Sequence, residues 1–215
     1  MILKRFTVGP LQTFAYIIGC PETKEAFLVD PANGAKFFKK QLEKEGLILK
    51  YIVATHGHPD HTSGTKAIKK IYPDAKFVMH PADDKFFRTK EAVQMFINWG
   101  FEPSPPADVH INDGDILEIG NLKFKCIHTP GHSPGSICLY GHGHVITGDT
   151  LFVGAAGRTD LPGGSFSHLI DSICNKLATL PDDTIVLPGH DYGDKPTSTI
   201  GEEKKSNIYM VEYCI

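Results

Sequence analysis

The segment THGHPDH, residues 55–61, brings three imidazoles and one carboxylate into six consecutive positions. These side chains are those of His56, His58, Asp60 and His61. Imidazole and carboxylate without thiolate suit zinc, iron, manganese or cobalt in an open site better than a closed structural zinc. A solvated loop that is rich in histidine is the alternative interpretation. One ion cannot readily use four groups from so short a stretch, so the segment indicates a site for two metal ions.

The residues around these histidines predict how the segment folds. The apolar run YIVATH, residues 51–56, is typical of a buried strand, and an extended continuation points His56 and His58 to the same side. The glycine and the proline that follow these two histidines prevent a regular continuation. We therefore expect the chain to turn Asp60 and His61 back toward the same space.

Three later segments end apolar runs with further residues that can bind metal. They are HTPGHSPGS with His128 and His132, VITGDTLF with Asp149, and IVLPGH with His190. In each case the run delivers its residue into a turn that contains glycine. This recurrence predicts that loops at one edge of the sheets converge on one site.

Strand and helix patterns are both abundant along the chain. The expected strands cover residues 2–8, 14–19, 25–30, 51–56, 76–80, 115–120, 122–129, 136–141, 144–149 and 184–190. The expected helices cover residues 34–46, 62–72, 83–99 and 166–179. The two kinds of element do not alternate strictly, so two mixed sheets with helices packed outside are predicted rather than a doubly wound sheet.

Composition and charge exclude several classes of function. A formal net charge of -3 gives no footprint for nucleic acid or an anionic membrane. No apolar run reaches the roughly 20 residues needed to cross a bilayer, and the first residues lack the apolar region of a signal peptide. The cysteines are odd in number, widely spaced and without a C-x-x-C pair, namely Cys20, Cys126, Cys138, Cys174 and Cys214. Buried free thiols in a reducing compartment, the cytoplasm, are therefore expected.

The motifs together resemble the metallo-β-lactamase fold. THGHPDH matches its H-x-H-x-D-H signature, and TPGHSPG, GDTLF and LPGH match its later motifs in order. Within this superfamily the chain is most similar to the glyoxalase II branch of thioester hydrolases and to the related persulfide dioxygenases. The resemblance implies an α/β protein, an αββα sandwich of two mixed sheets. It also implies a single domain over residues 1–215 without the C-terminal helical domain that binds glutathione in larger glyoxalase II enzymes.

The resemblance assigns roles to individual residues by motif. Carried over in this way, His56, His58 and His132 hold one metal, Asp60, His61 and His190 hold a second, and Asp149 bridges them. Asp30, in LVDP, matches a position that supports the site without binding metal. The cofactors implied are two divalent ions, zinc in the first place, with iron or manganese as alternatives. Asp60 and Asp149, together with a metal-bound water, are the expected catalytic groups.

Four further residues are candidates for supporting roles near the site. Arg158 and Asp160, in GRTD, are expected to form an internal ion pair that shapes the pocket. Tyr192, two residues after His190, either leans over the metals or packs as a loop aromatic. His128 is expected to be buried or supporting rather than a ligand, because Thr-Pro-Gly breaks the strand before His132.

The expected function is hydrolysis of a small acyl thioester, because two divalent ions can acidify water and a thiolate leaves without needing a proton. Two alternatives stay open. The first is a mononuclear iron dioxygenase that acts on a persulfide through a facial triad of His56, His132 and Asp149. The second is a metal-binding module without catalysis. The expected partner is a thioester or thiol-derived small molecule, with no nucleic acid and no membrane, and the protein is expected to be a monomer or homodimer.

Overall fold

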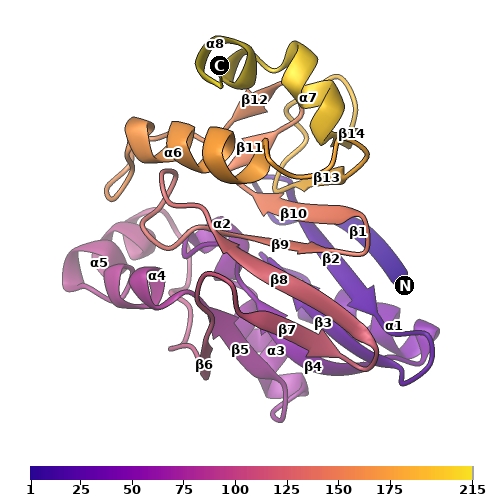
Figure 1. The fold of residues 1–215 in the computed structure, drawn as a ribbon. Helices are drawn as coiled ribbons and strands as arrows, with labels where there is room; N and C mark the ends of the chain where they lie inside the picture. The colour runs from indigo at the N-terminus through magenta and orange to yellow at the C-terminus, as the bar shows by residue number, and fades with distance from the viewer. Residues whose placement is uncertain (215) are drawn as a thin grey trace.

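Two mixed β-sheets face each other at the centre of the molecule, and helices cover the outer face of each sheet (Figure 1). The structure is a computed structural model and describes residues 1–214. The prediction of an αββα sandwich is confirmed.

The first sheet is formed by the N-terminal half of the chain. Its strands, in spatial order, are β1 (Ile2–Val8), β2 (Thr13–Gly19), β3 (Glu25–Val29), β4 (Ile48–Val53), β5 (Lys76–Met79) and β6 (Val109–His110). The pairs β1–β2 and β2–β3 are antiparallel, whereas β3, β4, β5 and β6 run parallel. The parallel strands end at one edge of the sheet, and the turn after β4 carries the histidine-rich segment.

The second sheet is formed by the C-terminal half. Its strands, in spatial order, are β14 (Ser198–Thr199), β13 (Ile185–Pro188), β10 (His144–Gly148), β9 (Ile137–Gly141), β8 (Leu122–His128) and β7 (Ile116–Ile119). Only β10 and β13 pair in parallel within it. A short hairpin of β11 (Leu151–Phe152) and β12 (Ala155–Ala156) follows β10.

The helices lie between these strands in the sequence. They are α1 (Ala35–Glu45), α2 (Pro59–Thr62), α3 (Thr65–Ile71), α4 (Pro81–Phe86), α5 (Lys90–Asn98), α6 (Phe166–Ser172), the π-helix η1 (Ile173–Leu177), α7 (Ile200–Ser206) and α8 (Ile208–Tyr213). Within residues 1–214, no helix has both the length and the apolar character needed to cross a membrane.

Three layers of apolar side chains hold the sandwich together. The central layer joins the two sheets, where the rings of Phe27 and Phe124 meet edge to face with centroids 5.1 Å apart. A second layer packs the outer face of the first sheet on α1 and α3 through side chains such as Phe38 and Ile68. A third packs the second sheet on α6, η1 and the C-terminal helices. Burial of apolar surface on both faces of each sheet is the main stabilising term of such an architecture.

The expectation of one continuous helix over residues 83–99 is wrong. Residues 83–99 form two helices, α4 and α5, with a break at Phe87–Thr89. The side chain of Thr89 caps α5 by accepting a hydrogen bond from the backbone N–H of Ala92, at 3.4 Å. A threonine that caps a new helix satisfies backbone donors that a continuous helix would use internally.

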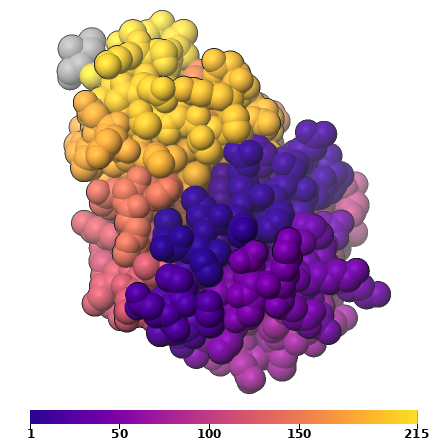
Figure 2. Space-filling view, turned by 90° about the vertical axis from the view of Figure 1, so that its right-hand side faces the viewer, coloured from indigo at the N-terminus to yellow at the C-terminus, as the bar shows by residue number. Residues whose placement is uncertain are grey.

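The C-terminal segment forms α7 and α8, which the sequence pattern did not predict. A capping box between Thr199 and Glu202 starts α7, and Asn207 caps α8 by accepting a hydrogen bond from the N–H of Tyr209. Figure 2 shows the yellow residues of this segment gathered at one end of the molecule.

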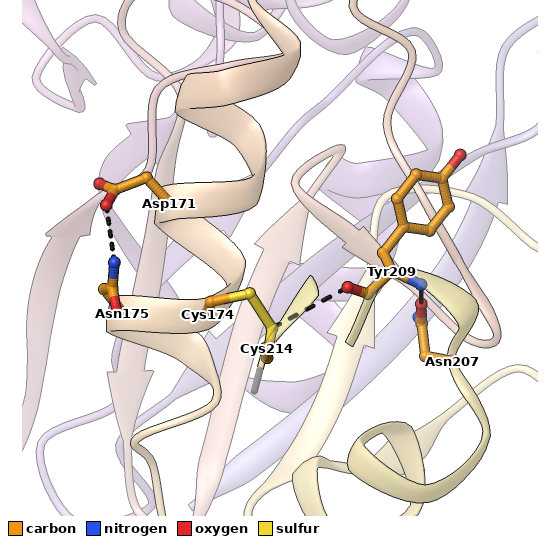
Figure 3. The surroundings of a disulfide bond; sticks show 6 residues. All are labelled: Asp171, Cys174, Asn175, Asn207, Tyr209 and Cys214. Carbon is orange, nitrogen blue, oxygen red and sulfur yellow. Dashed lines mark hydrogen bonds between the residues drawn. A yellow bond between two sulfur atoms is a disulfide. The ribbon is translucent and has the colours of Figure 1, made fainter. Parts of the chain in front are cut away.

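The expectation that all cysteines are free thiols is wrong. Cys174 of η1 and Cys214, directly after α8, form a disulfide, with their Cα atoms 4.8 Å apart (Figure 3). The pairing depends on α8 folding back onto η1, a contact between segments 40 positions apart. The remaining cysteines are free and buried, namely Cys20, Cys126 and Cys138. Residence in the cytoplasm stays a prediction.

Candidate metal centre

Seven side chains from both sheets meet at one edge of the sandwich. His56 and His58 follow β4, Asp60 and His61 lie on α2, His132 lies beyond β8, Asp149 follows β10 and His190 lies beyond β13. They form three groups that could each hold a metal ion, namely His56 with His58 and His132, His56 with His61 and Asp149, and Asp60 with His61 and His190. All are buried except Asp60, which solvent partly reaches. The structure therefore brings together every residue that the motifs singled out as a ligand.

The turn after β4 places its four side chains as the sequence suggested, with one difference. Pro59 begins α2, a single helical turn, and His58 precedes it with extended backbone angles. A proline at the first helical position supplies the backbone angle that the helix needs. This short helix, rather than an irregular loop, turns Asp60 and His61 toward the site.

Two histidine pairs lie at ligand spacing within the site. Nδ1 of His58 is 2.9 Å from Nε2 of His132, and Nε2 of His61 is 3.1 Å from Nε2 of His190. Oδ2 of Asp60 lies 3.5 Å from Nε2 of His61 and 3.4 Å from Nε2 of His190. We call the first set, His56 with His58 and His132, the three-histidine group. The second set, Asp60 with His61 and His190, is the mixed group.

Asp149 lies between the two groups. Its Oδ1 is 3.3 Å from Nε2 of His61, and its Oδ2 is 3.6 Å from Nε2 of His132 and 3.5 Å from Nε2 of His190. One carboxylate therefore faces both groups at once, which is the placement that a bridging ligand requires.

Hydrogen bonds at the outer ring nitrogens fix the tautomers of two histidines. Nδ1 of His132 donates to the backbone oxygen of Arg158 at 2.7 Å, and Nδ1 of His61 donates to Oδ2 of Asp30 at 2.9 Å. With Nδ1 held in this way, Nε2 of each ring is the atom that faces the centre and can bind an ion, which is the usual arrangement at metal-binding histidines.

Asp30 also reaches His56 through Thr55. The Thr55 hydroxyl donates to Oδ2 of Asp30 at 2.7 Å, and its oxygen lies 3.1 Å from Nδ1 of His56. Because the hydroxyl donates its proton to Asp30, it can only accept a hydrogen bond from Nδ1 of His56. Nε2 of His56 is then free to bind a metal ion. One buried carboxylate thus orients a ring in each group.

The donor set fits divalent ions. Ligands about 2.0–2.1 Å from a tetrahedral ion lie roughly 3.3 Å from one another, close to the nitrogen and oxygen spacings in both groups. Nε2 of His56 and Oδ1 of Asp149 are buried without a hydrogen-bond partner among the described residues. Buried polar atoms are rarely left unpaired, so these two atoms point to a cation as their partner.

The charges of the site favour the same conclusion. Burial, then the neighbouring His61 and His132, lower the pKa of His56, and burial lowers the pKa of His58 to about 3, so both rings are neutral. Burial opposes ionisation of Asp149, but the surrounding histidines hold its pKa well below the usual value. Burial also opposes the charge on His61, yet Asp149 and the other two carboxylates raise its pKa. His56 and His58 are therefore ready to bind an ion, whereas at His61 a divalent ion would replace the proton that the neighbouring carboxylates hold there.

The supporting residues named from the sequence differ in their placement. Arg158 and Asp160 form a two-pronged ion pair at 2.6 and 2.7 Å, but their side chains are 63% and 67% exposed, so the expectation of an internal pair is wrong. The contact of this segment with the site is the backbone oxygen of Arg158. Tyr192 stacks on the ring of His190, with centroids 5.0 Å apart, and remains 64% exposed.

His128 lies outside all three groups. Its Nε2 donates to the backbone oxygen of Pro134 at 2.9 Å, and its half-buried ring stacks on that of His80 with centroids 4.0 Å apart. The structure thus places His128 against Pro134 and His80, and its supporting role stays a prediction.

The C-terminal helices contact the hairpin that follows Asp149. Asn207 donates to the backbone oxygens of Phe152 and Ala155, at 3.3 and 3.0 Å. Buried Glu203 accepts from the N–H of Gly154 at 2.9 Å. The Phe152 ring in turn meets Tyr192 edge to face, so the C-terminal segment supports the wall of the site.

Sequence reasoning missed three residues that contact the ligand loops. Thr55 links Asp30 to His56, Asp83 accepts hydrogen bonds from both loops of the three-histidine group, and the ring of Phe87 packs against His58 with centroids 5.1 Å apart. Thr55 adjoins the motif, but Asp83 and Phe87 lie in a helical stretch with no signal that marks them.

Comparison with known proteins identifies relatives along almost the whole chain. A model of the metallo-beta-lactamase superfamily matches residues 8–190. The hydroxyacylglutathione hydrolase GloC of Haemophilus influenzae is 34% identical over 192 residues, which cover 88% of this chain and 89% of that protein. The mitochondrial persulfide dioxygenase of Homo sapiens is 33% identical over 217 residues, which cover 99% of this chain and 78% of that protein.

Solved structures with the same fold agree with this placement. The BLEG-1 B3 metallo-beta-lactamase superposes with a TM-score of 0.87 at 33% identity, covering 97% of this chain and 99% of that one. A protein solved in a di-iron-bound form gives a TM-score of 0.80 at 31% identity, covering 96% of this chain and 99% of that one.

Proposed function

The chain belongs to the metallo-beta-lactamase superfamily, and we propose that this metal-dependent enzyme hydrolyses small acyl thioesters at a dinuclear site. One observation carries the proposal: Asp149 faces both groups, with Oδ1 toward His61 and Oδ2 toward His132. A chain that used one ion at His56, His132 and Asp149 would not need the mixed group on the other side of that carboxylate. The similarity to a hydroxyacylglutathione hydrolase supports a thioester as the substrate.

The proposed ligand assignment follows the two groups. His56, His58 and His132 would hold one ion, Asp60, His61 and His190 the other, with Asp149 shared. Zinc is the proposed metal, with iron or manganese as the alternatives. A similar protein solved in a di-iron-bound form supports the count of two.

The chemistry that two such ions supply when bound is acidification of water and polarisation of a carbonyl. Asp149 and Asp60 place negative charge beside the attacking water, and Asp60, the one member that solvent partly reaches, accepts the proton that the water loses. The water oxygen bonds to the acyl carbon, the carbon–sulfur bond breaks and the thiolate departs. With a free-thiol pKa of about 8.5, the thiolate needs no proton from the protein.

Persulfide oxidation is the second candidate. The match to the relative named for that activity covers 99% of this chain at 33% identity, which is close to the 34% identity of the hydrolase. His56, His132 and Asp149 also supply two imidazoles and one carboxylate, the ligand set of mononuclear iron oxygenases. In that case the mixed group would bind no metal ion.

Two assays on one preparation test these candidates. Thiol release from a 2-hydroxyacyl thioester of glutathione is followed with a chromogenic thiol reagent, and oxygen uptake is followed with glutathione persulfide. Elemental analysis of protein purified without added metal accompanies both assays. Thioester cleavage without oxygen uptake, with two ions per chain, supports the proposal. Iron-dependent oxygen uptake without thioester cleavage under any metal overturns it in favour of the dioxygenase, and cleavage of a chromogenic β-lactam alone overturns both.

A further inference from the structure

A fully buried carboxylate joins the two loops of the three-histidine group. Asp83, in the first turn of α4, accepts hydrogen bonds at Oδ2 from the N–H of Gly57 and the hydroxyl of Ser133, both at 2.7 Å. At Oδ1 it accepts from the N–H of Gly135 at 2.5 Å. Gly57 separates the two histidines of the first loop, and Ser133 directly follows His132 of the second.

The loops and α4 are fitted to one another at these contacts. A Cβ atom at Gly57 would lie 2.1 Å from a ring carbon of Phe87, and a Cβ at Gly135 would lie 2.5 Å from the backbone nitrogen of Asp83. Only glycine lets each backbone approach α4 this closely. Both donors therefore reach the carboxylate because their loops carry no side chain at these points.

The second loop is also closed on itself around the same serine. The N–H of Ser133 donates to the hydroxyl oxygen of Ser136 at 3.1 Å, and the two hydroxyl oxygens lie 2.7 Å apart. Asp83 thus binds a preformed turn, which transmits the position of α4 to the neighbouring His132.

Asp83 and Asp30 act on different features of the site. Asp30 fixes ring orientation, since it reaches the outer nitrogens of His61 and, through Thr55, of His56. Asp83 contacts backbone and hydroxyl donors of two loops, and so fixes how far apart the loops lie. The 2.9 Å spacing between His58 Nδ1 and His132 Nε2 is measured across those two loops.

We propose that Asp83 is a positioning residue that sets the spacing of the three-histidine group and thereby its affinity for metal. The inference rests on the metal assignment of the proposed function. A carboxylate suits the role because it accepts all three hydrogen bonds and donates none. Asn at this position keeps the shape but aims an amide N–H₂ at a buried donor, which leaves that donor unpaired.

The test is Co²⁺ binding to metal-free protein, followed by visible absorption, in a His190→Asn background that disables the mixed group. Adding Asp83→Asn is expected to weaken Co²⁺ binding about 10- to 100-fold and to change the absorption bands, since supporting contacts have effects of this size. Asp84→Asn is the matched control. Asp84 is the next residue of the same helix, and its carboxylate accepts from Ala107 and His110, away from the site.

Ser133→Ala keeps the test decisive if Asp83→Asn does not fold. It removes one of the three donors, so a smaller loss of affinity in the same direction is expected. Co²⁺ affinity within twofold of the parent in a folded Asp83→Asn variant, or in Ser133→Ala where Asp83→Asn is unfolded, overturns the proposal.

His132→Asn in the same background separates this inference from the proposed function. If His132→Asn retains Co²⁺, the metal assignment is wrong and both proposals fail. If His132→Asn loses Co²⁺ while Asp83→Asn binds as the parent does, only the role of Asp83 is wrong.

Discussion

Oδ2 of Asp30 lies 2.9 Å from Nδ1 of His61, and the same oxygen accepts the Thr55 hydroxyl that contacts His56. In an Asp30→Asn variant the amide cannot accept strong hydrogen bonds from both His61 and Thr55. One histidine ring in each metal-binding group is then held less firmly. We expect about a 10- to 100-fold loss of metal affinity. Elemental analysis after dialysis against a weak chelator measures it, with Asp160→Asn on the surface as the control. Unchanged metal content in Asp30→Asn would contradict the supporting role.

Asp149→Ala removes the carboxylate between the groups. We expect reduced metal content and a fall in turnover by several orders of magnitude, because the change removes both charge and geometry from the centre. Metal analysis and thioester cleavage are measured on the same sample. Full metal content with near-normal turnover in Asp149→Ala would contradict the dinuclear interpretation.

His128 and His132 are near neighbours in one motif but differ in their partners. His132→Asn is expected to lose metal affinity steeply, whereas His128→Asn is expected to keep its metal, because His128 bonds to Pro134 outside the groups. Isothermal titration of the two metal-free variants with Zn²⁺ compares them. Equal losses would show that the wrong member of the pair has been assigned.

The Cys174–Cys214 disulfide closes a segment of 40 positions. Cross-links of this kind stabilise by about 2–4 kcal/mol. A reducing agent is therefore expected to lower the free energy of unfolding by about that amount, measured by urea denaturation. A Cys174→Ser, Cys214→Ser double variant should resemble the reduced protein and show no response to the reducing agent. A response in that variant equal to the parent's would assign the effect to another thiol.

Acidification should destabilise the metal-free protein through His58. Burial and His132 lower the pKa of His58 to about 3 in the folded protein, whereas its pKa in the unfolded chain is about 6.5. At a pH between these two values, His58 binds a proton in the unfolded chain but not in the folded protein. Stability is therefore lost as the pH falls through this window, by up to about 1.4 kcal/mol per pH unit from this group. His61 acts in the opposite direction, so the comparison is with His58→Gln, which should show a shallower slope between about pH 7 and about pH 5. Equal slopes in the two proteins would contradict the shift.

The sequence predicted the sandwich and the meeting of seven side chains because both depend on local patterns. His132, Asp149 and His190 each follow an apolar run that ends in a glycine turn, and such runs place their ends at sheet edges. Asp83 carries no such signal, since its partners lie 26 to 52 positions away and are found only after the loops have packed.

Other features escaped prediction because they depend on surroundings. The sequence predicts Arg158 and Asp160 inside, but opposite charges two residues apart pair equally well in solvent, and nothing in GRTD distinguishes the two environments. The disulfide depends on α8, a six-residue helix whose capping asparagine was not interpreted as a helix start.

The origin of the site in both sheets has a consequence for folding kinetics. His61 and His190 lie 129 positions apart in the chain, and contacts between such distant residues form late, after the local elements. Metal ligation therefore contributes little to the folding transition state and acts mainly on the rate of unfolding. The metal-loaded molecule should resist heat and proteases by opening slowly, and a chelator should remove that resistance without slowing refolding.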